Sequence, residues 1–397
     1  MEGKGTQLWT LSGDAQTYER NKNLLTGRLA NRFSPDQING HTLERGLENL
    51  VVKSSLDIIH DGCDLRKPYS KSLPHLTSVK ALDGDWVNGY NSFNSVAISD
   101  VNQEIHLLRC TPYCYADPHF NRSVGAGFGE KELIQAQIQQ TDQALKESFA
   151  GIDLWHLLDR KHDEQATFEL IDGLESYFVI RLKANRNSNE TKLDSAGKTQ
   201  SIKLLEANLD NTLTQILDRF VWKNRLYQQA KLTTTYGKLR LAEKTYQVVR
   251  IQVCDREGQP IFSQPMLLLT NAAIDNHQQT FQLYQRYLKR SKIEGVFKFL
   301  KEELGWEKFQ IRDFLAIQNI IVLCFFVAEY FYENQRQLCQ DSSVIMMCQL
   351  AKSKGKITKH FYTKGLAIVA NYLLVQQYIK EQNLSQQQVE QLVKAFK

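Results

Sequence analysis

The sequence predicts an α/β protein whose core is interrupted by a β-rich segment. Short apolar runs alternate with helical stretches in the first half, a block of alternating residues follows, and nearly everything after residue 280 has a helical pattern. The chain has 397 residues, of which 42% are hydrophobic and 23% are charged, and these values exclude a mainly disordered or collagen-like chain. This length allows two or three domains, or one large domain with an insertion.

The first half of the chain combines helical and strand-like patterns. Residues 1–55 are polar with spaced leucines, which predicts helix. The run Leu56–Asp61 is apolar, ends in an acid and precedes a glycine, so it predicts a buried strand that runs into a loop. The elements expected next are short strands at 96–98 and 105–108 and a helix from Glu130 to about Phe149, which has few breakers.

A second apolar run that ends in an acid follows, Leu154–Asp159, and it predicts another buried strand. Residues 185–199 are rich in Ser, Asn and Lys and predict a loop that leaves the core. Beyond them Tyr246–Val253 alternates between apolar and polar residues, which is typical of a strand. The other expected elements are a helix near 165–173, strands at 178–182 and 266–270, and helices from about 280 to the C-terminus.

The segment Phe314–Phe331 is long and apolar enough to resemble a membrane span. Gln318 and Asn319 interrupt it, and Glu329 lies near its end, so we interpret it as a helix buried in a large core. The first residues, Met1–Gln7, lack the apolar core of a secretion signal. We therefore expect a cytoplasmic protein with no membrane partner.

The net charge of +5, from 49 Lys and Arg against 44 Asp and Glu, permits a nucleic-acid partner without requiring one. Lysines cluster near the C-terminus with aromatic residues among them. This pattern is typical of a loop that contacts DNA phosphates, and equally of a solvated lysine-rich turn. The clustered residues are Lys352, Lys354, Lys356, Lys359 and Lys364, and the candidate DNA contacts are Lys354, Lys356 and Lys359.

The segment Tyr287–Lys301 combines a phenol, two cations and a carboxylate at helical spacing. Because helical residues turn by about 100° each, the four side chains share one stripe about 60° wide. Such a face suits phosphate binding, with the carboxylate holding a hard metal ion, and it equally suits a polar helix with incidental ion pairs. The four residues are Tyr287, Arg290, Glu294 and Lys301.

The spacing Y-x2-R-x3-E-x6-K is matched at every position, and it resembles the signature of a bacterial insertion-sequence transposase family, the one numbered four. Ile59–Pro68 resembles the first-aspartate block of that family, and Leu157–Asp163 resembles the second. Tyr177–Arg186 resembles the strand that follows, and Pro265–Asn271 the strand that leads out of the family's insertion. The resemblance extends from about residue 55 to 335.

The resemblance implies an RNase H-like core, a mixed sheet flanked by helices, with a DDE active site. Asp61, Asp159 and Glu294 would be the catalytic acids and would hold two Mg2+ ions, with Mn2+ as a substitute. A water would attack the phosphodiester at the transposon end, and the freed 3′-OH would close a hairpin, be reopened and attack target DNA. The residues implied to contact phosphates of the double-stranded end are Tyr287, Arg290 and Lys301.

The resemblance also implies a homodimer in a synaptic complex and a division of the chain into five parts. The N-terminal part is a candidate for contact with the DNA end, and the C-terminal part for contact with DNA or with the second protomer. The parts are 1–55 (helical N-terminal region), 56–185 (first part of the catalytic core), 186–280 (β-rich insertion), 281–335 (second part of the core) and 336–397 (helical C-terminal region).

Neighbouring acids leave the assignment of the first two catalytic residues open to alternatives. Asp57 and Asp64 lie near Asp61, and Asp163 lies near Asp159. We prefer Asp61 and Asp159 because each ends an apolar run. Asp64 and Asp163 suit supporting or helix-capping roles better.

One departure from the family pattern bears on activity: Lys161 and His162 stand where Gly-Phe is usual. This bulkier, charged pair either reshapes a loop beside Asp159 or weakens the metal geometry. Three functions therefore stay open, namely an active cut-and-paste transposase, a DNA-binding relic that has lost catalysis, and a non-specific nuclease on the same core.

Overall fold

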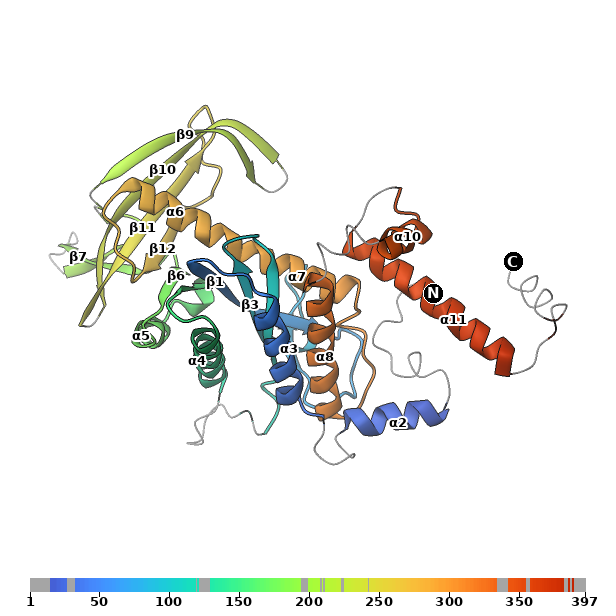
Figure 1. Ribbon diagram of the computed structural model, residues 1–397. Helices are drawn as coiled ribbons and strands as arrows, with labels where there is room; N and C mark the ends of the chain where they lie inside the picture. Colours follow the sequence, from blue (N-terminus) through green and yellow to red (C-terminus); the bar gives the residue numbers. More distant parts are fainter. Residues whose placement is uncertain are drawn as a thin grey trace.

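The computed structural model describes residues 15–26, 33–118, 120, 129–193, 199–207, 209, 211–222, 225–241, 243–333, 342–354, 358–381, 385 and 388. Lys356 and the first 14 residues of the expected N-terminal region lie outside these ranges. Within them, the strands form one ten-stranded sheet and a two-stranded hairpin, and helices cover both faces of the large sheet (Figure 1).

The sheet is built around β1 (Ser55–Arg66), whose apolar residues are buried on both faces. β1 pairs antiparallel with β3 (Trp86–Ser99) and parallel with β5 (Asp153–Leu158). The expectation that the first strand ends at Asp61 is wrong. β3 is long enough to continue the pairing to the end of β1, so Asp61 lies within the strand.

The strand order is β2-β3-β1-β5-β6-β12-β11-β10-β9, and β4 also pairs with β3. β1, β5 and β6 are parallel to one another, and the strands that flank this trio are antiparallel to it. A mixed sheet of this kind agrees with the predicted fold class. The remaining strands are β2 (Thr77–Lys80), β4 (Ile105–Tyr113), β6 (Tyr177–Arg181), β9 (Thr212–Trp222), β10 (Arg225–Leu241), β11 (Lys244–Cys254) and β12 (Met266–Thr270).

The β-rich segment extends the core sheet, because β12 pairs with β6 and the strands β11, β10 and β9 follow it. The prediction of a loop over 185–199 is wrong, since β7 (Asn187–Leu193) pairs there with β8 (Thr199–Lys203). β8 is polar and mostly exposed, and β7 is polar in sequence, so the hairpin lacks the apolar alternation by which strands are recognised. Besides the backbone pairing, Lys203 Nζ donates to Asn187 Oδ1 at 2.8 Å, and Ile202 packs against a core cluster.

Alternation along β1 assigns helices to the two faces of the sheet. Ile58 packs in one cluster with Leu145 of α4 (Glu130–Ser148), whereas Ile59 packs in another with Val296 of α7 (Lys292–Glu302). The other helices are α2 (Ala15–Leu25), α3 (Pro35–Asn49), α5 (Gln165–Gly173), α6 (His277–Leu288), α8 (Phe314–Glu333), α10 (Ser342–Leu350) and α11 (Lys359–Glu381), with short 3-10 helices η1 (Arg160–His162) and η2 (Lys289–Ser291).

α8 is the one helix among the described residues that is long and apolar enough to cross a membrane. Most of it is buried inside the protein, where Asn319 and Glu329 make hydrogen bonds. Asn319 Nδ2 donates to the Leu25 carbonyl at 2.7 Å, and Glu329 accepts from the Leu107 N–H and pairs with His106 Nδ1 at 3.0 Å. These contacts favour the predicted core helix.

The continuous helix predicted over Tyr287–Lys301 is interrupted by η2. α6 ends one residue after Tyr287, and α7 begins after the 3-10 turn that carries Arg290. A 3-10 turn has about 3.0 residues per turn, so the residues on either side of it do not share one α-helical stripe. α6 and α7 still follow one another across the sheet (Figure 1).

The C-terminal region is helical as predicted, and α11 extends away from the sheet (Figure 1). A capping box forms beyond it: the Ser385 N–H donates to Gln388 Oε1 at 2.9 Å, and the Gln388 N–H donates to Ser385 Oγ at 3.4 Å. α11 leaves large apolar side chains exposed, namely Ile368, Tyr372, Leu373 and Val375.

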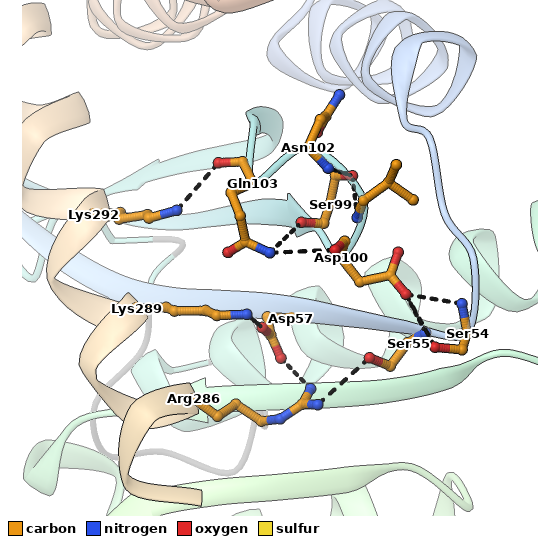
Figure 2. A network of polar contacts seen from close by, with 11 residues as sticks. Ser54, Ser55, Asp57, Ser99, Asp100, Asn102, Gln103, Arg286, Lys289 and Lys292 are labelled. Carbon is orange, nitrogen blue, oxygen red and sulfur yellow. Dashed lines mark hydrogen bonds and ion pairs between the residues drawn. The ribbon is translucent and has the colours of Figure 1, made fainter. Parts of the chain in front are cut away.

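We predict that Asp100→Asn destabilises the start of β1. The Asp100 carboxylate accepts the backbone N–H groups of Lys53, Ser54 and Ser55, at 2.9 Å, 2.9 Å and 3.0 Å (Figure 2). Desolvation opposes its ionisation, but these hydrogen bonds lower the pKa of Asp100 to about 2. Asparagine carries no charge, so the free energy of unfolding at pH 7 should fall by about 1.5–3 kcal/mol in urea denaturation.

The pH dependence of this difference provides the control. An unfolded aspartate has a pKa of about 3.9, so the stabilisation is fully present above that pH and is lost as the pH falls through the folded value of about 2. The gap between the wild type and Asp100→Asn should close in acid. A gap that is the same at every pH would contradict the ionic role.

Candidate active site

Two acids lie on the same face of neighbouring strands. The parallel register places Ile59 of β1 opposite Leu157 of β5 as its last pair; Asp61 lies two residues further along β1, Asp159 directly follows the end of β5, and the charge of Asp159 acts on Asp61. The backbone of Asp159 is still extended (φ −84°, ψ 179°), so both carboxylates point to the side on which Ile59 and Leu157 pack. Paired strands are about 4.8 Å apart. The pairing of β1 with β5 therefore brings the first two predicted acids together.

The third predicted acid, Glu294, comes from α7 on that face. Arg290 of η2 joins it to the sheet: Nη1 donates to Asp61 Oδ2 at 2.7 Å, and Nη2 donates to Glu294 Oε1 at 3.1 Å. The Glu294 side chain is 63% exposed, against 16% for Asp61. The site is therefore closed on the sheet side and open to solvent on the helix side.

The charges of the three acids act on one another. Burial raises the pKa of Asp61 to about 7, Arg290 opposes this rise, and the charges of Asp159 and Glu294 add to it. Burial lowers the pKa of the Arg290 guanidinium, but the surrounding acids more than reverse that effect. The site concentrates negative charge that a single guanidinium offsets in part, so it favours additional positive charge.

The donor chemistry of this cluster fits a hard divalent ion, because carboxylate oxygens are the ligands that Mg2+ takes in proteins. Asp61, Asp159 and Glu294 would hold it. Within the described part of the chain, no three His, Cys, Asp or Glu side chains are already arranged to hold a metal ion. Arg290 bridges two of the acids instead. Metal binding here would require Arg290 to release Asp61 or Glu294.

β6 adds a cation that the sequence analysis did not single out. β6 pairs with β5 so that Val179 lies opposite Leu157, and Arg181, two residues further, lies at the level of Asp159. The signal was present in the sequence, because Val179 and Arg181 alternate onto the face that carries the acids. Arg181 did not stand out in the sequence because most of its neighbours in the strand are apolar.

Tyr287 is buried at the end of α6, near Asp159 and Arg181. Burial raises the pKa of its phenol, and the nearby guanidinium groups of Arg290 and Arg181 oppose the rise. Tyr287 therefore lies near Arg290 and Asp159, but it is packed in the core and does not form part of an exposed stripe.

Lys301 lies further along β1 than the acids. Its Nζ donates to the Asp64 carbonyl at 2.6 Å and pairs with Glu307 at 2.9 Å. Lys301 follows Glu294 by seven residues in α7, so the two lie on the same side of that helix. In this structure its charge is therefore engaged by the protein.

The three alternative acids each have partners of their own. Asp57 is buried in a pair of ion pairs, Asp64 points to the opposite face of β1 from Asp61, and Asp163 anchors the segment that follows β6. These contacts favour the supporting roles predicted for Asp64 and Asp163. The partners are Arg286 and Lys289 for Asp57, Asn91 for Asp64 at 2.9 Å, and Arg186 for Asp163 at 2.8 Å.

Lys161 and His162 occupy different environments. Lys161 Nζ pairs with Glu130 at 2.6 Å, at the start of α4. His162 is buried, with its ring centroid 5.5 Å from that of Phe93 and its Nε2 3.8 Å from Asp159. Burial lowers the pKa of His162 to about 4, so it is a neutral ring at pH 7. The departure from the family pattern therefore places a buried neutral ring beside Asp159, together with a lysine that pairs with Glu130.

A cleft of about 450 Å3 opens beside Asp159. It lies between the turn that follows β5 and the segment that follows β6. Three cations line it, and positive side chains next to a carboxylate cluster suit a phosphate backbone. The lining residues are Asp159, Arg160, Lys161, Lys183, Ala184 and Asn185.

The lysines predicted as a C-terminal DNA surface do not share one environment. Lys354 is exposed. Lys359 lies with its Nζ 3.4 Å from the centroid of the Tyr332 ring, and burial lowers its pKa to about 8. Lys356 lies outside the described residues.

Comparison with known proteins adds one finding. Residues 136–329 match a family model described as a transposase DDE domain. This range contains Asp159 and Glu294, together with Arg290 and Arg181, whereas Asp61 precedes it. Asp61 is joined to the matched residues by the strand pairing and by Arg290. A search of curated proteins returned no match.

We predict that His162→Phe keeps the site intact and stabilises the protein more in mild acid than at pH 8. The folded pKa of about 4 lies below the value of about 6.5 for unfolded histidine, so between these values the unfolded state binds the extra proton and His162 lowers stability. Phenylalanine takes no proton. The gain in unfolding free energy should therefore be about 2 kcal/mol larger at pH 5 than at pH 8.

Urea denaturation of both proteins at the two pH values measures this difference. An equal gain at pH 5 and pH 8 would show that His162 is protonated in the folded protein.

Proposed function

From the premise that residues 136–329 belong to the transposase DDE family, we propose that the chain catalyses cut-and-paste DNA transposition. It would hydrolyse phosphodiester bonds at transposon ends and transfer the freed 3′-OH to target DNA. The observation that carries the proposal is the meeting of three acids from distant parts of the chain. Asp61 and Asp159 face one side of adjacent strands, and Arg290 ties Glu294 to Asp61 there.

The role of these acids is to hold divalent ions, Mg2+ or Mn2+. When bound, such ions activate the attacking water and stabilise the leaving oxygen. The chain supplies the frame: β1 and β5 fix Asp61 and Asp159, and α7 brings Glu294 to the solvent side. Burial of Asp61 keeps water away from the back of the site, so its carboxylate acts on the helix side only.

Cations around the acids would hold the DNA. Arg181 lies at the level of Asp159, and Arg290 lies between the acids, so both are near the position of a scissile phosphate. The cleft beside Asp159 continues this positive surface with Arg160 and Lys183. A duplex whose cleaved strand enters along this cleft would have its backbone neutralised on both sides of the reacting bond.

A second protomer is the other expected partner. The exposed apolar side chains of α11, which lie on a helix that extends from the body, support a contact with another copy of the chain in a synaptic complex. Transposon inverted-repeat ends and target DNA are the expected nucleic-acid partners.

One observation favours the alternative of a DNA-binding relic. Arg290 already pairs with both Asp61 and Glu294, so part of their charge is offset without a metal ion. An active enzyme must exchange this guanidinium for a divalent ion, and a relic need not. Cleavage of a labelled duplex that carries the DNA flanking the coding sequence, with Mg2+ present, decides between the two.

We predict that Glu294→Ala lowers cleavage of that duplex by more than about 100-fold, because it removes a metal ligand. End binding should stay within about threefold of the wild type, since the carboxylate does not contact phosphate. Gel-shift titration and gel-resolved cleavage measure the two effects. A comparable loss of binding would contradict a role confined to the metal.

We predict that Arg290→Ala weakens binding to the end and lowers the slope of log K against log salt by about 1, since one phosphate contact is lost. Lys131→Ala, at an exposed position that pairs with Glu164 on the surface, serves as the control and should leave the slope unchanged. An unchanged slope for Arg290→Ala would mean that this residue makes no phosphate contact.

A further inference from the structure

A second buried carboxylate lies on β1, on the same face as Asp61. Asp57 is 3% exposed, and each of its oxygens meets a different cation. Arg286 Nη1 donates to Oδ1, and Lys289 Nζ donates to Oδ2 at 2.6 Å (Figure 2). Both oxygens are thus engaged, and Asp57 is a poor candidate for a metal ligand. A carboxylate this deeply buried is stable only because it is paired.

Both cations come from the helical segment that leads to the active site. Arg286 belongs to the last turn of α6 and Lys289 begins η2, and the Arg286 guanidinium also lies 4.2 Å from the centroid of the Trp155 ring. Lys292, at the start of α7, donates to the Gln103 carbonyl at 3.1 Å (Figure 2). The segment is therefore held to β1, to β5 and to the turn after β3.

The three cations that make these contacts are evenly spaced along the helical segment. Arg286, Lys289 and Lys292 are three residues apart, and in a 3-10 turn residues at this spacing line up on one side. In a regular α-helix each step of three would rotate the next side chain by about 60° away from the row. The three cations reach the sheet from adjoining turns, Arg286 from the end of α6, Lys289 from η2 and Lys292 from the start of α7.

The same turn presents the active-site residues. Arg290 follows Lys289 directly, and it reaches Asp61, four residues beyond Asp57 on the same face of β1. Because Lys289 and Arg290 share one tight turn, the position of Lys289 on Asp57 fixes where the Arg290 guanidinium meets Asp61 and Glu294. Asp57 and Asp61 of β1 are therefore contacted by successive residues of one helical segment.

We propose that Asp57 is a positioning residue for the active site: with Arg286 and Lys289 it holds the 3-10 turn in the register that brings Arg290 and Glu294 over Asp61. This inference rests on the proposed function for the role of those residues. Asp57 itself acts through Lys289 and Arg290 and touches neither DNA nor metal.

The test compares Asp57→Asn with Asp100→Asn in the full chain. Both substitutions remove a carboxylate that is hydrogen-bonded near the start of β1 (Figure 2), but Asp100 contacts only loop and strand backbone and the Ser54 hydroxyl. Well below both melting temperatures, Asp57→Asn should lower kcat for end cleavage about 100-fold, as a misplacement of about 1 Å does. The KM for DNA should change little, and Asp100→Asn should cleave within about twofold of the wild type.

Two measurements keep the test valid if Asp57→Asn folds poorly or if cleavage is not observed. Lys289→Met should reproduce the loss of kcat, and Lys289→Arg should restore most of it. Hydrogen exchange, which needs no activity, should speed up at the amides of residues 286–294 in Asp57→Asn and stay unchanged there in Asp100→Asn.

The outcomes distinguish a failure of the catalytic assignment from a failure of the positioning role of Asp57. If Asp61→Asn cleaves normally, the catalytic assignment fails whatever Asp57 does. If Asp61→Asn is inactive while Asp57→Asn behaves like Asp100→Asn in cleavage and exchange, the positioning role of Asp57 fails alone. Equal losses of cleavage and of DNA binding in Asp57→Asn would also overturn it.

Discussion

The architecture of this protein depends on two carboxylates buried on one face of a central strand. Carboxylates buried in a sheet require nearby cations, and those of Asp57 and Asp61 come from one helical segment, α6–η2–α7. That requirement determines where the segment crosses the sheet. It also determines which residues of the segment face the sheet, and it leaves Glu294 at the solvent edge, where a substrate can reach it.

The sheet contributes a second constraint. Parallel pairing fixes Asp61 and Asp159 side by side, and the next strand brings Arg181 to the same level. The β-rich segment does not displace Asp61, Asp159 or Arg181, because its strands are added to the sheet beyond β6, through β12. A long stretch of sequence between the second and third acids is therefore accommodated without moving any of them. The positive cleft beside Asp159 lies at the junction between the core and this added part.

Much of this site could be predicted from the sequence, because buried strands that end near acids and a spaced Tyr-Arg-Glu pattern are local signals. The extent of the first strand could not, since pairing beyond Asp61 depends on the length of β3. Nor could the break at η2, where the neighbouring cations pair with Asp57, 229 residues before Arg286. Arg181 was hidden within an apolar strand, and the β7–β8 hairpin lacks apolar alternation altogether.

The distance along the chain between the partners has a consequence for biosynthesis. Asp61 and Arg290 are separated by 229 residues, and a ribosome that adds about 5–20 residues per second needs about 10–45 s to cover them. During that time β1 has its acids but not their counter-ions, so this face of the sheet cannot close. The cluster of Asp61, Arg290 and Glu294 therefore forms only after the intervening strands have been made, and a nascent chain interrupted before α7 lacks it.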